Sequence, residues 1–161
     1  MDNRFPLDSG EAICLFRMLL GRPMPGIGVS FSNLITDQAG YFQSVLEARA
    51  FDIIQPDVTK VGGISEERRI GWMAQEHGVR FIPHGWNTAV GLAADLQLAS
   101  AFPGTDLIEY LTGSPFIDEI TAGGWHLDGD GMLAIPSKPG LGLTLDPDAV
   151  KKYTRGERLL E

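Results

Sequence analysis

Apolar and polar positions follow a repeating order of helix and strand over residues 35–110. Apolar residues recur at helical spacing in three segments, and short apolar runs bounded by turn residues lie between those segments. The expected elements, in chain order, are a helix at 37–49, a strand at 52–55, a helix at 65–77, a strand at 79–82, a helix at 88–101 and a strand at 106–110. Short strands separated by helices predict an α/β fold with parallel strands, built from βαβ units.

Two of the predicted helices carry distinct signals. In the helix at 65–77, Ser65 is expected to be the N-cap, and Glu66 and Glu67 occupy the first turn, where the helix dipole favours acids. The helix at 88–101 is apolar almost all round, so we expect it to be buried on more than one side.

The segments on either side of this repeat are less regular. Before it, a helix at 9–20 and a short strand at 27–31 are expected. After it, the sequence WHLDGDGMLAI predicts a hairpin whose turn is the DGDG tetrad, and a short helix follows at 147–153. We interpret the chain as a single domain spanning 1–161, with regular βα units at 35–110 and an irregular closing segment at 111–161.

Composition limits the class of protein. Of the 161 residues, 43% are hydrophobic and 21% are charged, which is typical of a globular protein with a core. The formal net charge of −8 argues against nucleic acid or an anionic membrane as a partner. No apolar run reaches the roughly 18 residues of a membrane span, and the polar N-terminus does not resemble a signal peptide. Cys14 is the single cysteine, which excludes an internal disulfide, so we expect a cytoplasmic protein.

Polar residues stand at or just beyond the ends of three predicted strands, namely Asp57, His84 and Glu109. They are 27 and 25 residues apart, about one βα unit each, so we expect them at the same rim of the sheet, with Asp57 exposed. Adjacent parallel strands lie about 4.8 Å apart, which lets Asp57 hydrogen-bond to His84. A carboxylate that accepts from one imidazole nitrogen fixes the tautomer and raises the basicity of the other nitrogen, as general acid–base catalysis requires.

Alternative interpretations exist for each polar residue of this kind. A lone Asp or His at a strand end is more often a cap or a loop hydrogen-bonding group, and only the pair in register favours catalysis. His77, at a helix C-terminus, and His126, in the hairpin, are interpreted as structural. Lys60 with Gly62 and Gly63 lacks the spacing of a phosphate loop, so a turn is expected there.

Several segments of the chain resemble one family. DIIQPDVTKVGGISE, PHGWNTAVGLAADLQLA and DLIEYLTGSPFIDEI are similar to the second half of the barrel in the mandelate racemase/muconate lactonizing enzyme branch of the enolase superfamily. GMLAIPSKPGLGLTLD is similar to the closing segment of that barrel, and the resemblance covers about residues 35–150. It implies a partial TIM-type (β/α) barrel, because a complete barrel takes about 250 residues.

The resemblance also implies a reaction and the residues that carry it. Members of this family bind Mg²⁺ and abstract the proton α to a carboxylate, and the metal stabilises the resulting enediolate. By resemblance, His84 is the general base and Asp57 is its partner. Glu109 is then the acid that contacts the substrate carboxylate or the enediolate, and Trp86 and Asn87 are expected to bind the substrate.

The metal ligands that the resemblance implies are only partly present. Asp2 is the one acid at a position where the family places a ligand. The acid-acid-proline motif of the middle ligand is absent, and the sequence SFSN at 30–33 stands where the third ligand is expected. A lysine motif that racemases use for a second base is also absent, so the sequence resembles a shortened member of the family.

Several functions stay open at this point. Dehydration of a sugar acid is preferred, because a single His–Asp dyad suffices for it, and a racemase or epimerase is a further alternative. The alternative from another class is an inactive partial barrel that serves for binding or assembly. A doubly wound cofactor-binding fold is disfavoured, since no glycine-rich fingerprint follows a first strand. We also expect a homo-oligomer that buries the sheet edges at 27–31 and 106–110.

Overall fold

The structure, a computed structural model, describes residues 30–32, 39–111 and 113–155. Its elements, in chain order, are β1 (Ser30–Ser32), α2 (Ala39–Glu47), β2 (Ile53–Gln55), α3 (Ile64–Glu76), β3 (Arg80–Phe81), α4 (Ala89–Ala101), α5 (Pro115–Asp118) and α6 (Pro147–Tyr153). Apart from small shifts of their ends, the helices and strands predicted between 37 and 101 are present, and so is the short helix at 147–153. The helix expected at 9–20 and the proposed ligand Asp2 lie outside the described residues.

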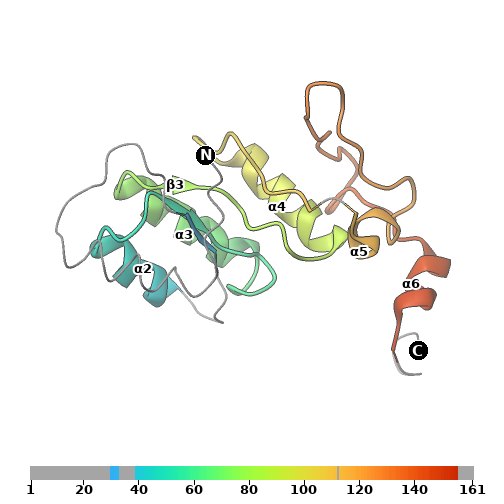
Figure 1. The fold of residues 1–161 in the computed structure, drawn as a ribbon, viewed down its shortest axis with the longest axis horizontal. Coiled ribbons are helices and arrows are strands. Elements are labelled where there is room, and N and C mark those ends of the chain that lie inside the picture. The colour runs from blue at the N-terminus through green and yellow to red at the C-terminus, as the bar shows by residue number, and fades with distance from the viewer. Residues whose placement is uncertain (1–29, 33–38, 112, 156–161) are drawn as a thin grey trace.

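The three strands form one parallel sheet in the order β1-β2-β3. Ser30 pairs with Ile53, and Ile53 pairs in turn with Arg80. Helices α2 and α3 lie beside the strands at one end of the molecule, and α5 and α6 lie at the other end with α4 between (Figure 1). This arrangement confirms an α/β fold with parallel strands, of which the described residues supply part of a barrel.

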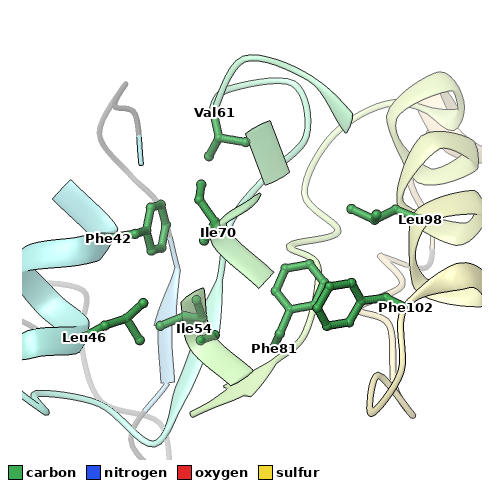
Figure 2. Packing of buried hydrophobic residues seen from close by; sticks show 9 residues of the cluster. Phe42, Leu46, Ile54, Val61, Ile70, Phe81, Leu98 and Phe102 are labelled. Carbon is green, nitrogen blue, oxygen red and sulfur yellow. The ribbon is translucent and has the colours of Figure 1, made fainter. Parts of the chain in front are cut away.

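One hydrophobic cluster joins the sheet to three helices. Its large members are Phe42 and Leu46 from α2, Ile54 from β2, Val61, Ile70 from α3, Phe81 from β3, and Leu98 and Phe102 at and after the end of α4 (Figure 2). The rings of Phe81 and Phe102 are tilted, with centroids 5.2 Å apart. Because each such side chain contributes about 1.5–3 kcal/mol when fully buried, this cluster holds α3 and α4 against the sheet.

Helix α3 starts at a different residue from the one predicted, whereas α4 is as expected. The N-cap of α3 is Gly63 and not Ser65, and Gly63 has φ +94°, a left-handed conformation that glycine adopts without strain. The turn from Asp57 to Gly63 is tightened by its own backbone hydrogen bonds, which starts the helix earlier than the sequence signal predicts. The burial predicted for α4 is confirmed, because most of its residues are buried, including Asp95.

The predicted strand at 106–110 is not a strand. The segment is held beside β3 by one long backbone hydrogen bond, from Glu109 N to Pro83 O at 3.4 Å, and by side chains. Arg80 binds both carboxylate oxygens of Asp106, at 2.6 and 2.8 Å. A strand requires successive ladder bonds, and here side-chain contacts replace them.

The closing segment is irregular, as expected. Its hairpin is reduced to one antiparallel bridge, between Leu127 and Leu133, and the turn is closed by Asp128, whose Oδ1 accepts from two backbone N–H groups. The short helix α5 was not predicted. Within the described ranges, no helix has the length and apolar character of a membrane span.

Candidate functional site

Parallel pairing of β2 with β3 continues beyond the strands and brings Asp57 and His84 together. Ile82 N donates to Ile54 O at 3.1 Å, and His84 N donates to Pro56 O at 2.9 Å. The backbones just past the strand ends therefore remain neighbours. The expected exposure of Asp57 is wrong, because its side chain is fully buried by the turn that leads into α3.

The predicted contact between Asp57 and His84 is present. His84 Nδ1 lies 3.1 Å from Asp57 Oδ2, within hydrogen-bonding distance, and both side chains are buried. Because a carboxylate only accepts, Nδ1 carries the proton of this bond. The lone pair of the neutral ring is then on Nε2, which points away from Asp57.

Asp57 has further donors that the sequence did not predict as partners. Thr59 donates to Oδ1 from its backbone N–H at 2.9 Å and from its hydroxyl, and Lys60 Nζ donates to Oδ2 at 2.9 Å. Burial alone would raise the pKa of Asp57, but the hydrogen bonds from His84, Thr59 and Lys60 outweigh it and hold this pKa well below its usual value. Asp57 is thus a buried carboxylate that stays ionised.

Glu109 reaches the other side of the His84 ring. Its Oε2 lies 3.9 Å from His84 Nε2, accepts from Gly85 N at 2.9 Å, and lies 3.4 Å from Gln55 Nε2. The backbone of Glu109 approaches Gly85 so closely that a Cβ on Gly85 would stand 2.0 Å from the Glu109 carbonyl oxygen. The structure therefore places Asp57, His84 and Glu109 in one row, with the His84 imidazole between the two carboxylates.

Trp86 and Asn87 lie in the same loop but face different surroundings. The Trp86 side chain is 68% exposed. The side-chain amide of Asn87 is turned toward α4, and its Nδ2 lies 3.1 Å from Asp95 Oδ2 on that helix. The same Nδ2 lies 3.4 Å from the carbonyl oxygen of His84 in the loop. Substrate binding by Trp86 and Asn87 stays a prediction. The contact that the structure shows for Asn87 connects the loop to α4.

Two buried acids behind this site were not singled out from the sequence. Glu67 of α3 and Asp95 of α4 are both fully buried. Burial, the charge of Asp95 and a hydrogen bond with Asp95 raise the pKa of Glu67 to about 10. Burial also raises the pKa of Asp95, to about 7, against the opposing hydrogen bond from Asn87. An acid in the middle of the otherwise apolar segment 88–101 was the available signal for Asp95.

Two cavities lie near these elements but do not contain the row of three residues. The larger, about 500 Å³, is lined by the β2–α3 turn and the start of α4, with Thr59, Thr88 and Leu141 among its walls. The other, about 290 Å³, lies within the closing segment. Neither lining includes His84 or Glu109, so substrate contacts are inferred from the side chains around the imidazole.

The described residues do not fit a magnesium site. Among them, no group of three or more His, Cys, Asp or Glu side chains is arranged to hold a metal ion. Asp57 has its oxygens occupied by protein donors, and Glu67 and Asp95 are buried as a pair. Mg²⁺ prefers carboxylate and water ligands in octahedral geometry, which this set of acids does not offer.

Comparisons with known proteins agree on one family. A family model described as Enolase C-terminal domain-like matches residues 25–149. The D-galactarolactone cycloisomerase of Agrobacterium fabrum is 34% identical over 146 residues, which are 85% of this chain and 37% of that protein. The D-xylonate dehydratase of Haloferax volcanii is 35% identical over 127 residues, 74% of this chain and 29% of that protein.

A solved structure extends the likeness to the fold. The mandelate racemase/muconate lactonizing enzyme from Sulfitobacter sp. is 28% identical and has a TM-score of 0.74, covering 96% of this chain and 37% of that one. The chain thus spans about a third of the length of these relatives.

Proposed function

This chain belongs to the enolase superfamily, in its mandelate racemase/muconate lactonizing enzyme branch, and from that premise we propose that it takes part in abstracting the proton α to a carboxylate, as the first step in dehydrating a sugar acid. The observation that carries the proposal is the hydrogen bond between Asp57 and His84 Nδ1, which leaves Nε2 as the free nitrogen beside Glu109. The relatives named sugar-acid dehydratase support the choice of substrate class.

The proposed chemistry of the dyad follows from its hydrogen bonds. His84 Nε2 takes the α-proton, so the C–H bond breaks, an N–H bond forms, and the electron pair moves into the substrate carboxylate as an enediolate. The imidazolium that results is stabilised by the ionised Asp57 on its other nitrogen. In dehydration, collapse of the enediolate breaks the C–O bond at the β-carbon, and the departing hydroxyl takes the proton that His84 Nε2 now holds and leaves as water, which restores the neutral imidazole.

Glu109 is proposed to act on the substrate and not on the histidine. Its oxygen is oriented by Gly85 N–H and partly exposed, on the Nε2 side of the ring. In its protonated form it would donate a hydrogen bond to the substrate carboxylate or the enediolate. Trp86 is largely exposed in the adjoining loop and is proposed to cover the substrate. Asn87 is also proposed to contact the substrate.

Magnesium stays outside these steps. The family resemblance implies it, but the acids of the described residues do not fit it. We therefore assign no role to the ion on this chain beyond a proposal to be measured: calorimetric titration with Mg²⁺ is expected to give millimolar binding or none. Micromolar binding would contradict this and would direct the search to Asp2.

The test of the proposed function is a dehydration assay over a panel of sugar acids, with and without Mg²⁺. The His84→Asn variant is expected to abolish turnover and to leave thermal stability nearly unchanged, because Asn keeps a polar side chain but cannot take the proton. His126→Asn, a matched change in the closing segment, should leave turnover as it was. Absence of turnover by the unmodified chain on every acid would favour the alternative, an inactive piece for binding or assembly.

The same assay separates the remaining alternatives. One relative is named a cycloisomerase, and a cycloisomerase, racemase or epimerase also begins with a proton moved at an α-carbon. Loss of water gives a keto acid, whereas racemisation in D₂O gives exchange at the α-carbon without loss of water. Exchange without keto acid would move the assignment to racemisation.

Assembly stays a proposal as well. We propose that a second copy covers the sheet edge at β1, which among the described residues pairs with β2 alone, since an unpaired strand edge would attract other strands. Sedimentation velocity at micromolar concentration should show a dimer or a larger closed assembly. A monomer under those conditions would contradict this proposal without touching the dyad.

A further inference from the structure

Glu67 and Asp95 lie where two helices pack behind the proposed dyad. Glu67 is in the first turn of α3 and Asp95 is in the middle of α4, and both side chains are fully buried. The negative charge of Asp57 acts on both carboxyls and raises the pKa of each. The pair is thus adjacent to the site but takes no part in the chemistry proposed above.

The cluster formed by Glu67, Asp95 and Asn87 has fewer hydrogen-bond donors than acceptors. With both acids ionised, four buried oxygens have no donor among the described residues, namely Glu67 Oε1, Glu67 Oε2, Asp95 Oδ1 and Asn87 Oδ1, and a bond between the two acids requires a proton on one of them. The donor that does serve the pair is Asn87 Nδ2, 3.1 Å from Asp95 Oδ2. Two ionised carboxylates side by side, buried and short of donors, would strongly destabilise the fold. A proton retained on one of them removes a charge and supplies a missing donor.

Charged groups on the neighbouring elements do not neutralise the pair. Lys60 is bound to Asp57. On β3, Arg80 is bound to Asp106 at the surface, and on α2, Glu47 accepts from Gln43 in an exposed contact. The ionisable groups that act on the pair from the site are Asp57 and His84. Among the described residues, a proton is therefore what balances these two acids.

The cluster is connected to the catalytic loop through one side chain. Asn87 Nδ2 bonds to Asp95 and lies 3.4 Å from the carbonyl oxygen of His84 itself. Gly91 makes room for this amide, because a Cβ at Gly91 would stand 2.5 Å from the Asn87 side-chain carbon. The position of the His84 backbone thus depends on a helix that carries an acid at the point of contact.

We propose that Glu67 and Asp95 share a single proton at neutral pH and, through Asn87, act as a positioning unit that holds the 84–88 loop and the His84 ring. Glu67 carries the proton and donates it to Asp95, and Asp95 remains an acceptor for Asn87. The unit touches neither substrate nor the reacting atoms. Its effect on catalysis rests on the proposed function, whereas the shared proton and the fixed loop do not.

The first experiment tests the proton without any assay of turnover. In the full chain labelled with ¹³C at side-chain carboxyls, the Glu67 carbon should have the chemical shift of a protonated acid at pH 7. Glu76→Gln, the same change at an exposed position of α3, is the control for assignment and stability. An ionised Glu67 at pH 7 would overturn the proposal, because a cation elsewhere in the chain would then neutralise it.

The second experiment tests positioning with paired variants. Glu67→Gln copies the protonated acid, and Asp95→Asn keeps an acceptor for Asn87, so both should retain the Nδ1–H proton resonance of His84 and keep kcat within about threefold. Glu67→Ala, Asp95→Ala and Gly91→Ala should broaden that resonance and lower kcat by about tenfold or more with a smaller change in KM, since a loop shift of about 1 Å is costly.

The outcomes separate the two proposals. If the unmodified chain has no turnover, the proposed function fails, and the carboxyl shift and the His84 resonance still decide the positioning unit. If Glu67→Gln is as damaging as Glu67→Ala, the shared proton is wrong. If Gly91→Ala folds normally and leaves the His84 resonance sharp, the connection through Asn87 is wrong.

Discussion

Asp57 and the pair Glu67–Asp95 are equally buried, yet their surroundings have opposite effects on the proton. Asp57 receives hydrogen bonds from Thr59, Lys60 and His84, and its pKa falls well below the usual value. Glu67 and Asp95 share few donors and face one another, and their pKa values rise. Burial pushes all three in the same direction, so the difference comes from the supply of N–H and O–H groups.

The source of those donors explains why the two regions differ. Asp57 begins a tight turn, and a turn presents backbone N–H groups and the side chains of the next residues to its first carboxylate. The backbone N–H of Glu67 is already bonded to Gly63 O, and the N–H groups in the middle of α4 are bonded within that helix, so neither acid gains a donor from its own stretch of helix. A carboxyl at a strand end is thus readily kept as an anion, and one between packed helices is readily kept neutral.

Removing the charge of Asp57 should have the largest effect. Asp57→Asn keeps the shape but leaves His84 Nδ1 without an anionic acceptor, so the wrong tautomer becomes accessible and the imidazolium loses its partner. Turnover of the responsive sugar acid should fall by about 10³–10⁴-fold. The measurement is kcat/KM, with Asp130→Asn in the exposed turn as the matched control. A loss of less than tenfold would show that Asp57 is a structural acid.

The free energy of unfolding, plotted against pH, should fall on the acid side because of Asp57 and on the alkaline side because of Glu67 and Asp95. Asp57 has a lowered pKa when folded, so its contribution is complete above about pH 5 and is lost as the pH falls further. Glu67 and Asp95, raised to about 10 and about 7, make the folded state hold extra protons, so stability falls as pH rises above about 5. That fall is about 1.4 kcal/mol per pH unit for each extra proton.

Urea melts across pH 3–10 measure this curve. The three groups together should place maximum stability near pH 5, Glu67→Gln should flatten the alkaline side, and Asp57→Asn should flatten the acid side. Equal stability at pH 5 and pH 9 in the unmodified chain would contradict the contrast between the two regions.

A methyl group at Gly85 should disturb the row around the imidazole without changing a charge. In Gly85→Ala, the new Cβ would lie 2.0 Å from the Glu109 carbonyl oxygen, so the 108–110 segment must move and Glu109 leaves His84 Nε2. We expect kcat/KM to fall by about 10²-fold. Gly129→Ala is the matched control, since a Cβ there meets nothing within 4 Å. Normal turnover by Gly85→Ala would remove Glu109 from the proposed mechanism.

Lys60 should have the smallest effect of these. Its Nζ shares Oδ2 of Asp57 with His84, and its side chain is 36% exposed, so solvent screens much of the interaction. Lys60→Met should raise the pKa of Asp57 somewhat and change stability at pH 7 by less than about 1 kcal/mol, with turnover within about tenfold. Lys151→Met on α6 is the control. The acid side of the urea-melt curve should move to higher pH in Lys60→Met alone.

Local patterns in the sequence predict much of the fold. Apolar spacing locates α2, α3 and α4 and the parallel strands between them, because burying one face of a helix or strand is decided by a few neighbouring residues. The expected strand at 106–110 fails for a different reason. Its apolar pattern is that of a strand, but Asp106 and Glu109 find side-chain and backbone partners on the neighbouring segments that take the place of a ladder.

The row of site residues was predictable for the same kind of reason. The spacing of 27 residues between Asp57 and His84 is one βα unit, and parallel pairing turns that spacing into a hydrogen bond of 3.1 Å. The burial of Asp57 was not predictable, because it depends on the turn into α3 folding back over the carboxylate. The donors Thr59 and Lys60 come from that same turn.

The sequence by itself determined the order of helices and strands, the rim at which Asp57, His84 and Glu109 meet, and membership of the enolase superfamily. Only the tertiary structure decided the direction in which the pKa of each buried acid moves. Glu67 and Asp95 are 28 residues apart and carry no shared motif, and each alone is an ordinary acid on a predicted helix. Packing of α3 against α4 removes both from water at once, and the free energy of a buried carboxyl is set by the donors that packing brings to it.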